Sequence, residues 1–315
     1  MHLNLACLPF RMLPTFLVVA TSIAALPAAA CADQVILPAL KDSTLFADDE
    51  GRFANGSGEN IFIGATANQS SRRVCISFNL SSIPAGSTIT AATLRLTVNR
   101  SVAITSMRID LHRLTADWGE GASNSGGPEG AGTNAAAGDA TWLHKFFPNV
   151  FWTTAGGDFA ELSSGFTTVP TGSTGNHSWV ATQANANAAM LADLQAWRNG
   201  TAPNFGWVMI GDEGGLKNAR RYASRTALSA AARPQLTITF TPPPAPTCLA
   251  DLVGGDGNPP ADGSADGNDF VSFLNAFGAA DPLADLVGGD GNPPADGNVD
   301  GNDFQAFLNG FAAGC

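Results

Sequence analysis

Most of the chain alternates between apolar and polar residues in short runs. In residues 74–80, 94–98, 107–111 and 236–240 every second residue is apolar, and Gly, Ser, Asn and Pro lie between the runs. A period of two predicts antiparallel strands with one buried face. Many such strands over about 200 residues predict a mainly β fold class, with a jelly-roll-like antiparallel β-sandwich over residues 33–240.

Three other stretches have helical spacing. Ala188 to Trp197 places Leu191, Leu194 and Trp197 on one face, with Gly200 as a stop signal. Near the C-terminus, apolar residues recur twice at i, i+3, i+4 and i+7, which predicts two short amphipathic helices. Their apolar faces consist of Phe270, Phe273, Leu274 and Phe277, and of Phe304, Phe307, Leu308 and Phe311.

Each C-terminal helix follows an acidic loop, and the two loops are copies. The run Asp-Gly-Asn-Pro-Pro-Ala-Asp-Gly begins at Asp256 and returns 34 residues later at Asp290. A repeat marks a structural unit. Each unit is therefore expected to be a carboxylate-rich loop followed by one helix, a small α module after the β-sandwich.

Such dense carboxylates repel one another unless a cation binds between them. Oxygen ligands at positions 1, 3, 5, 7, 9 and 12, with Gly at position 6, are typical of an EF-hand calcium loop. Gly263 and Gly297 fit position 6. The predicted ligands of two calcium ions are Asp256, Asn258, Asp262, Ser264, Asp266 and Asp269 in the first loop, and Asp290, Asn292, Asp296, Asn298, Asp300 and Asp303 in the second. The fit departs at an inserted Pro-Pro-Ala and at Asp in position 12; a solvated acidic linker is the alternative.

The tandem EF-hand-like loop–helix units, a Cys-Leu-Ala-Asp-Leu opening at Cys248 and a Gly314-Cys315 ending resemble a dockerin domain of the GC type. The resemblance covers residues 248–315. It implies calcium-dependent folding and docking onto a cohesin-like or cell-surface receptor.

The net charge comes entirely from this C-terminal region. From Leu249 onward there are eleven Asp and no Lys or Arg, and the other 16 acidic residues balance the 16 basic ones, so the formal charge of −11 lies here. No basic stripe is present, and a nucleic-acid partner is not expected.

The N-terminus predicts a secretory signal peptide over residues 1–32. An apolar run from Met12 to Leu26 follows Arg11, and small residues allow cleavage near Ala30 or Ala32. The run is too short to be a transmembrane segment. We therefore expect a protein that is secreted, extracellular or associated with the cell surface; Cys31 leaves a lipoprotein as an alternative.

Two cysteines, Cys248 and Cys315, bracket the acidic repeats. In an oxidising compartment we expect them to pair, which would stabilise a small module by about 4 kcal/mol. Cys75 is expected to be an inert strand residue. The Pro-rich residues 241–247 predict an extended linker between the two domains.

Seven stretches of the larger domain match a known family in order: residues 78–86, 92–96, 114–120, 196–200, 204–207, 221–224 and 234–238. They resemble the DNRLRE domain, also called carbohydrate-binding module family 96. The resemblance implies a β-sandwich that binds acidic polysaccharide such as alginate. Residues 119–180 depart from the family by being longer and rich in Gly, and residues 119–138 predict a long surface loop or partial disorder.

Basic residues cluster around Tyr222, the only tyrosine of the chain. The cluster is a candidate carbohydrate site, because Arg binds carboxylates through paired hydrogen bonds. Its members are Lys217, Arg220, Arg221, Tyr222 and Arg225. Two alternatives stay open: ordinary solvated strand residues, or a lyase site with Tyr222 as the base. Arg72 and Arg73 form a second candidate patch, again weighed against ordinary surface charge.

Other candidate groups are less informative. His112, His144 and His177 lie in different segments without zinc-binding spacing. Aromatic residues between Trp142 and Trp179 suit either a core or a sugar-binding platform. Taken together, the sequence favours a non-catalytic carbohydrate-binding or surface protein with a calcium-dependent C-terminal anchor. A polysaccharide lyase and a purely structural surface protein are the alternatives.

Overall fold

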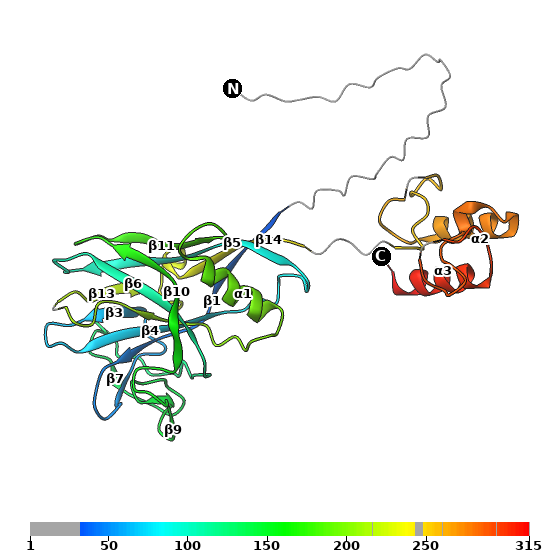
Figure 1. Ribbon diagram of the computed structural model, residues 1–315. Coiled ribbons are helices and arrows are strands. Elements are labelled where there is room, and N and C mark those ends of the chain that lie inside the picture. Colours follow the sequence, from blue (N-terminus) through cyan, green and yellow to red (C-terminus); the bar gives the residue numbers. More distant parts are fainter. Residues whose placement is uncertain (1–31, 216, 243–247, 260, 294, 315) are drawn as a thin grey trace, which may run out of the picture. The chain divides into compact units, whose positions relative to one another are not determined.

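The computed structural model describes residues 32–215, 217–242, 248–259, 261–293 and 295–314. The predicted signal peptide up to Cys31, most of the Pro-rich linker, and Cys315 lie outside the described residues. Two parts, each with its own hydrophobic core, are described here separately: the β domain (residues 33–241) and the C-terminal module (residues 248–314) (Figure 1).

Ten antiparallel strands form the framework of the β domain. One layer contains β3 (Asn60–Ala65), β5 (Thr88–Ser101), β11 (Gly175–Thr182), β13 (Arg220–Ala223) and β14 (Gln235–Thr241). The other contains β4 (Ser71–Phe78), β6 (Met107–Leu114), β10 (Phe159–Val169) and β12 (Trp207–Ile210). Strand β1 (Asp33–Phe46) joins the layers, because its first residues pair with β14 and its later residues with β4. The expected mainly β class with antiparallel strands is confirmed; the jelly-roll topology stays a prediction.

The main core lies between the two layers. Along β5, Ala92, Leu94, Leu96 and Val98 are buried while their neighbours are more exposed, as the alternation predicted. Helix α1 (Ala188–Arg198) forms where the sequence placed it and packs against β5, β10 and β11. Its apolar side chains Met190, Leu191, Leu194 and Trp197 are buried.

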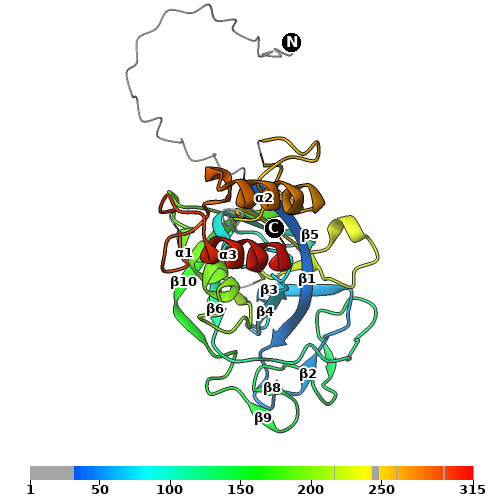
Figure 2. The ribbon, with the colours of Figure 1, turned by 90° about the vertical axis from the view of Figure 1, so that its right-hand side faces the viewer.

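A second core covers the outer face of the layer that contains β4. There Trp118 and Trp152 pack in one cluster with Cys75 and Val208, and burial raises the pKa of the Cys75 thiol to about 12. The covering segment carries the short pairs β2 (Phe53–Ala54) with β7 (Thr133–Asn134), and β8 (His144–Phe146) with β9 (Val150–Phe151). Figure 2 shows β2, β8 and β9 at one end of the β domain.

The sequence predicted a long surface loop or disorder for residues 119–138. The segment is a long, mostly exposed or half-buried loop of turns and irregular structure, as predicted, and it also contains the two-residue strand β7. Of the aromatic residues that suited either a core or a sugar-binding platform, Trp152 and Trp179 are buried in the core. Phe151 is 56 % exposed and does not belong to the core.

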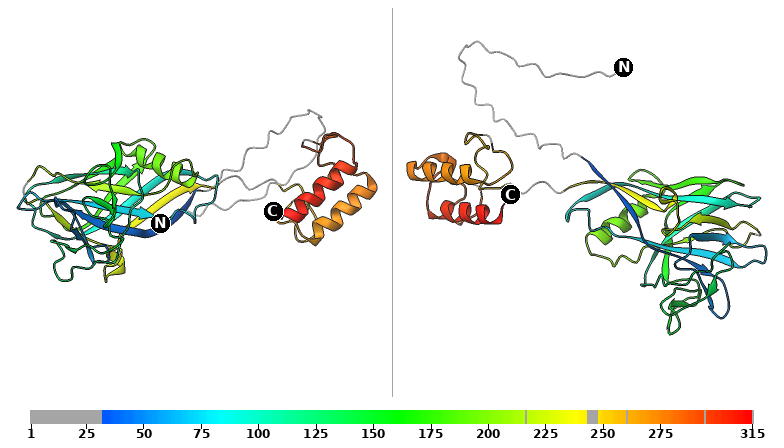
Figure 3. Two further views of the ribbon diagram at one scale, coloured as in Figure 1. Left: turned by 90° about the horizontal axis from the view of Figure 1, so that it is seen from below. Right: turned by 180° about the vertical axis from the view of Figure 1, so that it is seen from behind.

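The C-terminal module contains α2 (Gly267–Ala279) and α3 (Gly301–Ala313), which lie side by side in Figure 3. Both helices were expected from the spacing of their Phe residues. Phe273 and Phe307 are fully buried, and their rings stack with centroids 4.0 Å apart. A short 3-10 helix, η2 (Pro282–Ala284), precedes the second acidic loop. The β domain also contains a 3-10 helix, η1 (Ala230–Ala232).

Within the described ranges, every helix is too short or too polar to cross a membrane.

Replacing Phe307 by Ala should destabilise the C-terminal module. The stacked ring is fully buried, so its loss leaves a cavity that costs about 3–5 kcal/mol. Calorimetry of the full chain should show a lower transition for the module. Tryptophan fluorescence should report an unchanged β domain, because all six Trp lie between residues 118 and 207. Phe304→Ala is the matched control; Phe304 is 36 % exposed, and a loss as large as that of Phe307→Ala would contradict this account.

Candidate functional site

The last predicted ligand of each acidic loop is a buried carboxylate. Asp269 accepts hydrogen bonds from the backbone N–H groups of Leu252 and Val253 at 2.7 and 2.8 Å, and from that of Asp266 at 2.8 Å. Burial alone would raise the pKa of Asp269, but these bonds outweigh it and the pKa is lowered. Asp269 thereby fixes the start of the loop against the start of α2.

The second repeat reproduces this arrangement. Asp303 accepts from the N–H groups of Leu286, Val287 and Asp300 at 2.7, 2.9 and 2.8 Å, and its pKa is lowered in the same way. Asp266 and Asp300 are the N-caps of α2 and α3. The duplicated sequence therefore builds duplicated contacts.

A further carboxylate in each loop was missed by the sequence reasoning. Asp251 accepts from the N–H groups of Asp262 and Gly263 at 3.1 and 2.7 Å, although it lies 11 and 12 residues before them. Asp285 does the same for Asp296 and Gly297 at 3.2 and 2.7 Å. The repeat itself carried the signal, since Ala-Asp-Leu-Val precedes both acidic runs.

Gly263 and Gly297 have the backbone that position 6 of a calcium loop requires. Their φ angles are +94° and +88°, in the region that favours glycine. The expectation of a sharp turn at these residues is confirmed. Asp251 and Asp285 contact this turn, and neither was among the predicted ligands.

The remaining predicted ligands are solvent-exposed. Asp256 accepts from Asn258 N–H at 3.0 Å, and Asp290 accepts from Asn292 N–H at 3.0 Å. The other exposed members are Asp262, Ser264, Asp266, Asp296, Asn298 and Asp300. Within the described ranges no group of three or more His, Cys, Asp or Glu side chains is arranged to hold a metal ion. The donor chemistry, carboxylates and amides without any cationic side chain, suits Ca²⁺.

Cys248 at the start of the module is disulfide-bonded. Its expected partner, Cys315, lies outside the described residues, so the pairing stays a prediction.

The candidate carbohydrate residues around Tyr222 separate in the fold. Arg220 and Tyr222 are fully buried and cannot contact a polysaccharide. Arg220 donates to the carbonyl oxygens of Asn218, Thr105, Val169 and Pro170 at 2.7–3.2 Å and so ties loops together. Burial raises the pKa of the Tyr222 hydroxyl, so the hydroxyl stays protonated and cannot take a proton from a substrate.

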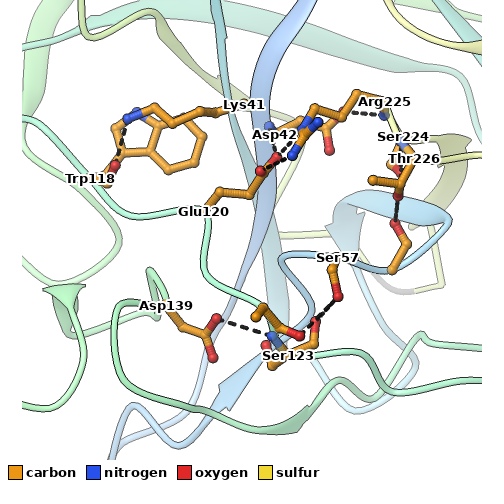
Figure 4. Close-up of polar contacts among 12 residues, drawn as sticks. Lys41, Asp42, Ser57, Trp118, Glu120, Ser123, Asp139, Ser224, Arg225 and Thr226 are labelled. Carbon is orange, nitrogen blue, oxygen red and sulfur yellow. Dashed lines mark hydrogen bonds and ion pairs between the residues drawn. The ribbon is translucent and has the colours of Figure 1, made fainter.

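Arg225 faces a different group, shown in Figure 4. Its guanidinium forms an ion pair with Glu120, and its backbone N–H donates to the Asp42 carboxylate at 2.6 Å. Glu120 also accepts from the Asp42 N–H at 2.8 Å. Asp42 is 1 % exposed, and burial raises the pKa of its carboxyl to about 7. Arg225 is therefore held by acidic groups and is not available to an acidic sugar.

Lys217 and Arg221 come together in a cavity of about 440 Å³, which we call the cationic pocket. Arg72 from β4 and Arg100 from β5 complete its set of cations, and Phe62 forms part of its apolar wall. The sequence reasoning named Arg72 for another patch and missed Arg100. Nothing in the sequence pattern shows that the ends of β5 and β13 meet. Arg73 points elsewhere and forms an ion pair with Glu213 at 2.8 Å.

No protein-family model matches the chain, and no curated protein is similar to it. The two resemblances seen in the sequence therefore remain hypotheses.

The free energy of unfolding of the wild-type protein should decrease with rising pH because of Asp42, and Asp42→Asn should abolish this decrease. Because the folded protein holds the Asp42 pKa at about 7, above its ordinary 3.8, the folded state binds an extra proton between these values. The free energy of unfolding of the wild-type protein should therefore decrease as pH rises from about 4 to about 7, by at most about 4 kcal/mol. Asn cannot release this proton. Urea unfolding at about pH 5 and about pH 8 measures the difference.

Asp110→Asn is the control for this experiment. Burial raises the pKa of Asp110, but hydrogen bonds from Arg108 and Ser163 outweigh it, and the net pKa is lowered. Asp110 therefore releases its proton below the pH range of the experiment, and Asp110→Asn should keep the wild-type pH dependence. If Asp42→Asn and the wild-type protein show the same pH dependence, the buried carboxyl does not control it.

Proposed function

We propose that the chain is a secreted, non-catalytic carbohydrate-binding protein anchored by its C-terminal module. The module binds calcium in its two acidic loops and docks onto a cohesin-like or cell-surface partner. The observation that carries this proposal is the equivalence of the loops: Asp251 and Asp269 make the same backbone contacts as Asp285 and Asp303. Equal contacts on duplicated acidic residues are expected where each loop binds the same ion.

Calcium would neutralise a strongly acidic surface. The module has eleven Asp and no Lys or Arg, and most of these carboxylates are exposed. In each loop the bound ion would take oxygen ligands from the predicted set, with Asp251 and Asp285 added to it. Like charges at this density oppose folding unless a cation reduces their repulsion.

The β domain supports the carbohydrate-binding part of the proposal. Its two layers of antiparallel strands are compatible with a jelly-roll-like sandwich, a fold that presents ligand sites on a rigid framework. The cationic pocket offers a place for an acidic polysaccharide such as alginate.

The lyase alternative receives less support. It needs an accessible base, and the Tyr222 hydroxyl is buried, has no hydrogen-bond partner among the described residues and has a raised pKa. Incubating the protein with alginate and following the ultraviolet absorbance of unsaturated product separates the two functions. We expect no such product.

Calcium should stabilise the C-terminal module of the full chain, with two ions bound. At calcium concentrations of about 100 times the dissociation constant, each site adds about 2.7 kcal/mol to the free energy of unfolding. Calorimetry with calcium and with a chelator measures this shift. Asp251→Ala should remove one ion and most of its stabilisation, because Asp251 holds the turn at Gly263.

Asp281→Ala is the control for charge alone. Asp281 is an exposed acid of the same module whose side chain accepts from Leu283 N–H, outside both loops. It should leave two ions bound. A chelator that has no effect on the wild-type module would overturn the calcium-dependent anchor, and equal effects of Asp251→Ala and Asp281→Ala would remove Asp251 from the site.

A further inference from the structure

The cationic pocket gathers positive charge, and no acidic side chain of the described residues forms an ion pair with its cations. Arg100 on β5 and Arg221 on β13 are directly opposite each other across antiparallel strands. Side chains in this position share one face of the sheet, and like charges there are destabilising. Arg221 donates to the Asn99 amide oxygen at 2.7 Å, which is a neutral partner.

Several basic residues elsewhere in the β domain form ion pairs. Arg73 pairs with Glu213, Arg113 with Asp193 and Arg225 with Glu120. Within the described ranges, none of the ion pairs involves Arg72, Arg100, Lys217 or Arg221. An arrangement that costs stability and has no internal counter-charge is expected where an anionic ligand binds.

Arg72 lies at the pocket as a buried cation with unused hydrogen-bonding capacity. It is only 7 % exposed, and its Nε has no partner among the described residues. Its terminal nitrogens donate to Ser70 Oγ at 2.6 Å and to the Ser71 carbonyl oxygen at 2.9 Å. A charged group taken out of water with only neutral partners is costly, and an anion in the pocket would reduce that cost.

The pocket edge is held in place before any ligand binds. Glu129 is buried and accepts from the backbone N–H groups of Glu59 and Asn60 at 3.1 and 2.8 Å. Its neighbours Pro128 and Gly130 line the pocket. The Glu129 carboxylate is thus used to fix the loop, and none of the described residues that line the cavity is acidic.

The pocket walls are not only charged. Phe62, Val102 and Pro128 line the cavity beside the cations. A small inorganic anion uses no apolar wall, whereas a sugar ring has an apolar face that packs against such side chains. A carboxylate on the ring matches the planar donors of Arg.

We propose that the cationic pocket binds a uronic acid residue of an anionic polysaccharide, with Arg100 and Arg221 on its carboxylate, Arg72 behind them and Phe62 against the ring. This assignment rests on the proposed function of the β domain and names the site and the ligand group. Arg100 and Arg221 are the binding residues, and Arg72 supports them from the pocket interior.

The test is calorimetric titration of the full-length protein, in calcium, with an alginate hexamer. Arg100→Gln and Arg221→Gln should each weaken binding about tenfold to hundredfold, the usual effect of losing a charge-assisted hydrogen bond. Arg95→Gln is the matched control. It removes the same charge from the same strand, and Arg95 donates to the Ala231 carbonyl oxygen outside the pocket. It should change the affinity less than about threefold.

Each result has a definite meaning. Weak binding in both pocket variants with a normal Arg95→Gln supports the site. An equal loss of affinity in all three variants overturns the site. Unchanged affinity in all three variants also overturns it, and the protein then binds polysaccharide elsewhere. Inorganic phosphate that binds as tightly as the hexamer, or a neutral cellohexaose that does so, overturns the uronic acid assignment. No binding of the hexamer to the wild-type protein overturns both the site and the carbohydrate function, while leaving the calcium anchor intact.

Discussion

The constraint on which this structure depends is that a charged group removed from water needs a partner. Asp269 and Asp303 meet it with three backbone N–H donors each, and these bonds tie each acidic loop to its helix. The terminal nitrogens of Arg220 meet it with carbonyl oxygens from separate loops, although its Nε has no partner among the described residues. In both parts of the molecule, buried charge fixes segments that hydrophobic contacts alone would leave less defined.

Where cations that line a cavity have only neutral partners, the structure points to function. Arg72 is buried with neutral partners, and Arg100 and Arg221 oppose each other without an acid between them. In the C-terminal module the excess has the opposite sign, since its exposed carboxylates have no cationic side chain nearby in sequence. One part thus has unbalanced positive charge suited to an anion, and the other has unbalanced negative charge suited to a cation.

These two imbalances fit a protein with divided tasks. The β domain provides a rigid framework, because β1 pairs with strands of both layers and the outer face of the β4 layer is covered by a second core. The C-terminal module has a small core built around Phe273 and Phe307, so its stability depends more on its loops. Binding of a cation at those loops would then control the module while the β domain stays folded.

The sequence by itself determined the local elements. Alternation predicted the strands, the spacing of Phe residues predicted α2 and α3, and the duplication predicted equivalent turns at Gly263 and Gly297. It did not determine which charged side chains meet. In strand β13, Arg220 and Tyr222 are buried whereas Arg221 between them is half-buried, so Arg221 joins Arg72 and Arg100 while Tyr222 enters the core. Strand pairing and the path of an inserted loop decide such contacts, and both follow from packing between segments that are distant in the chain.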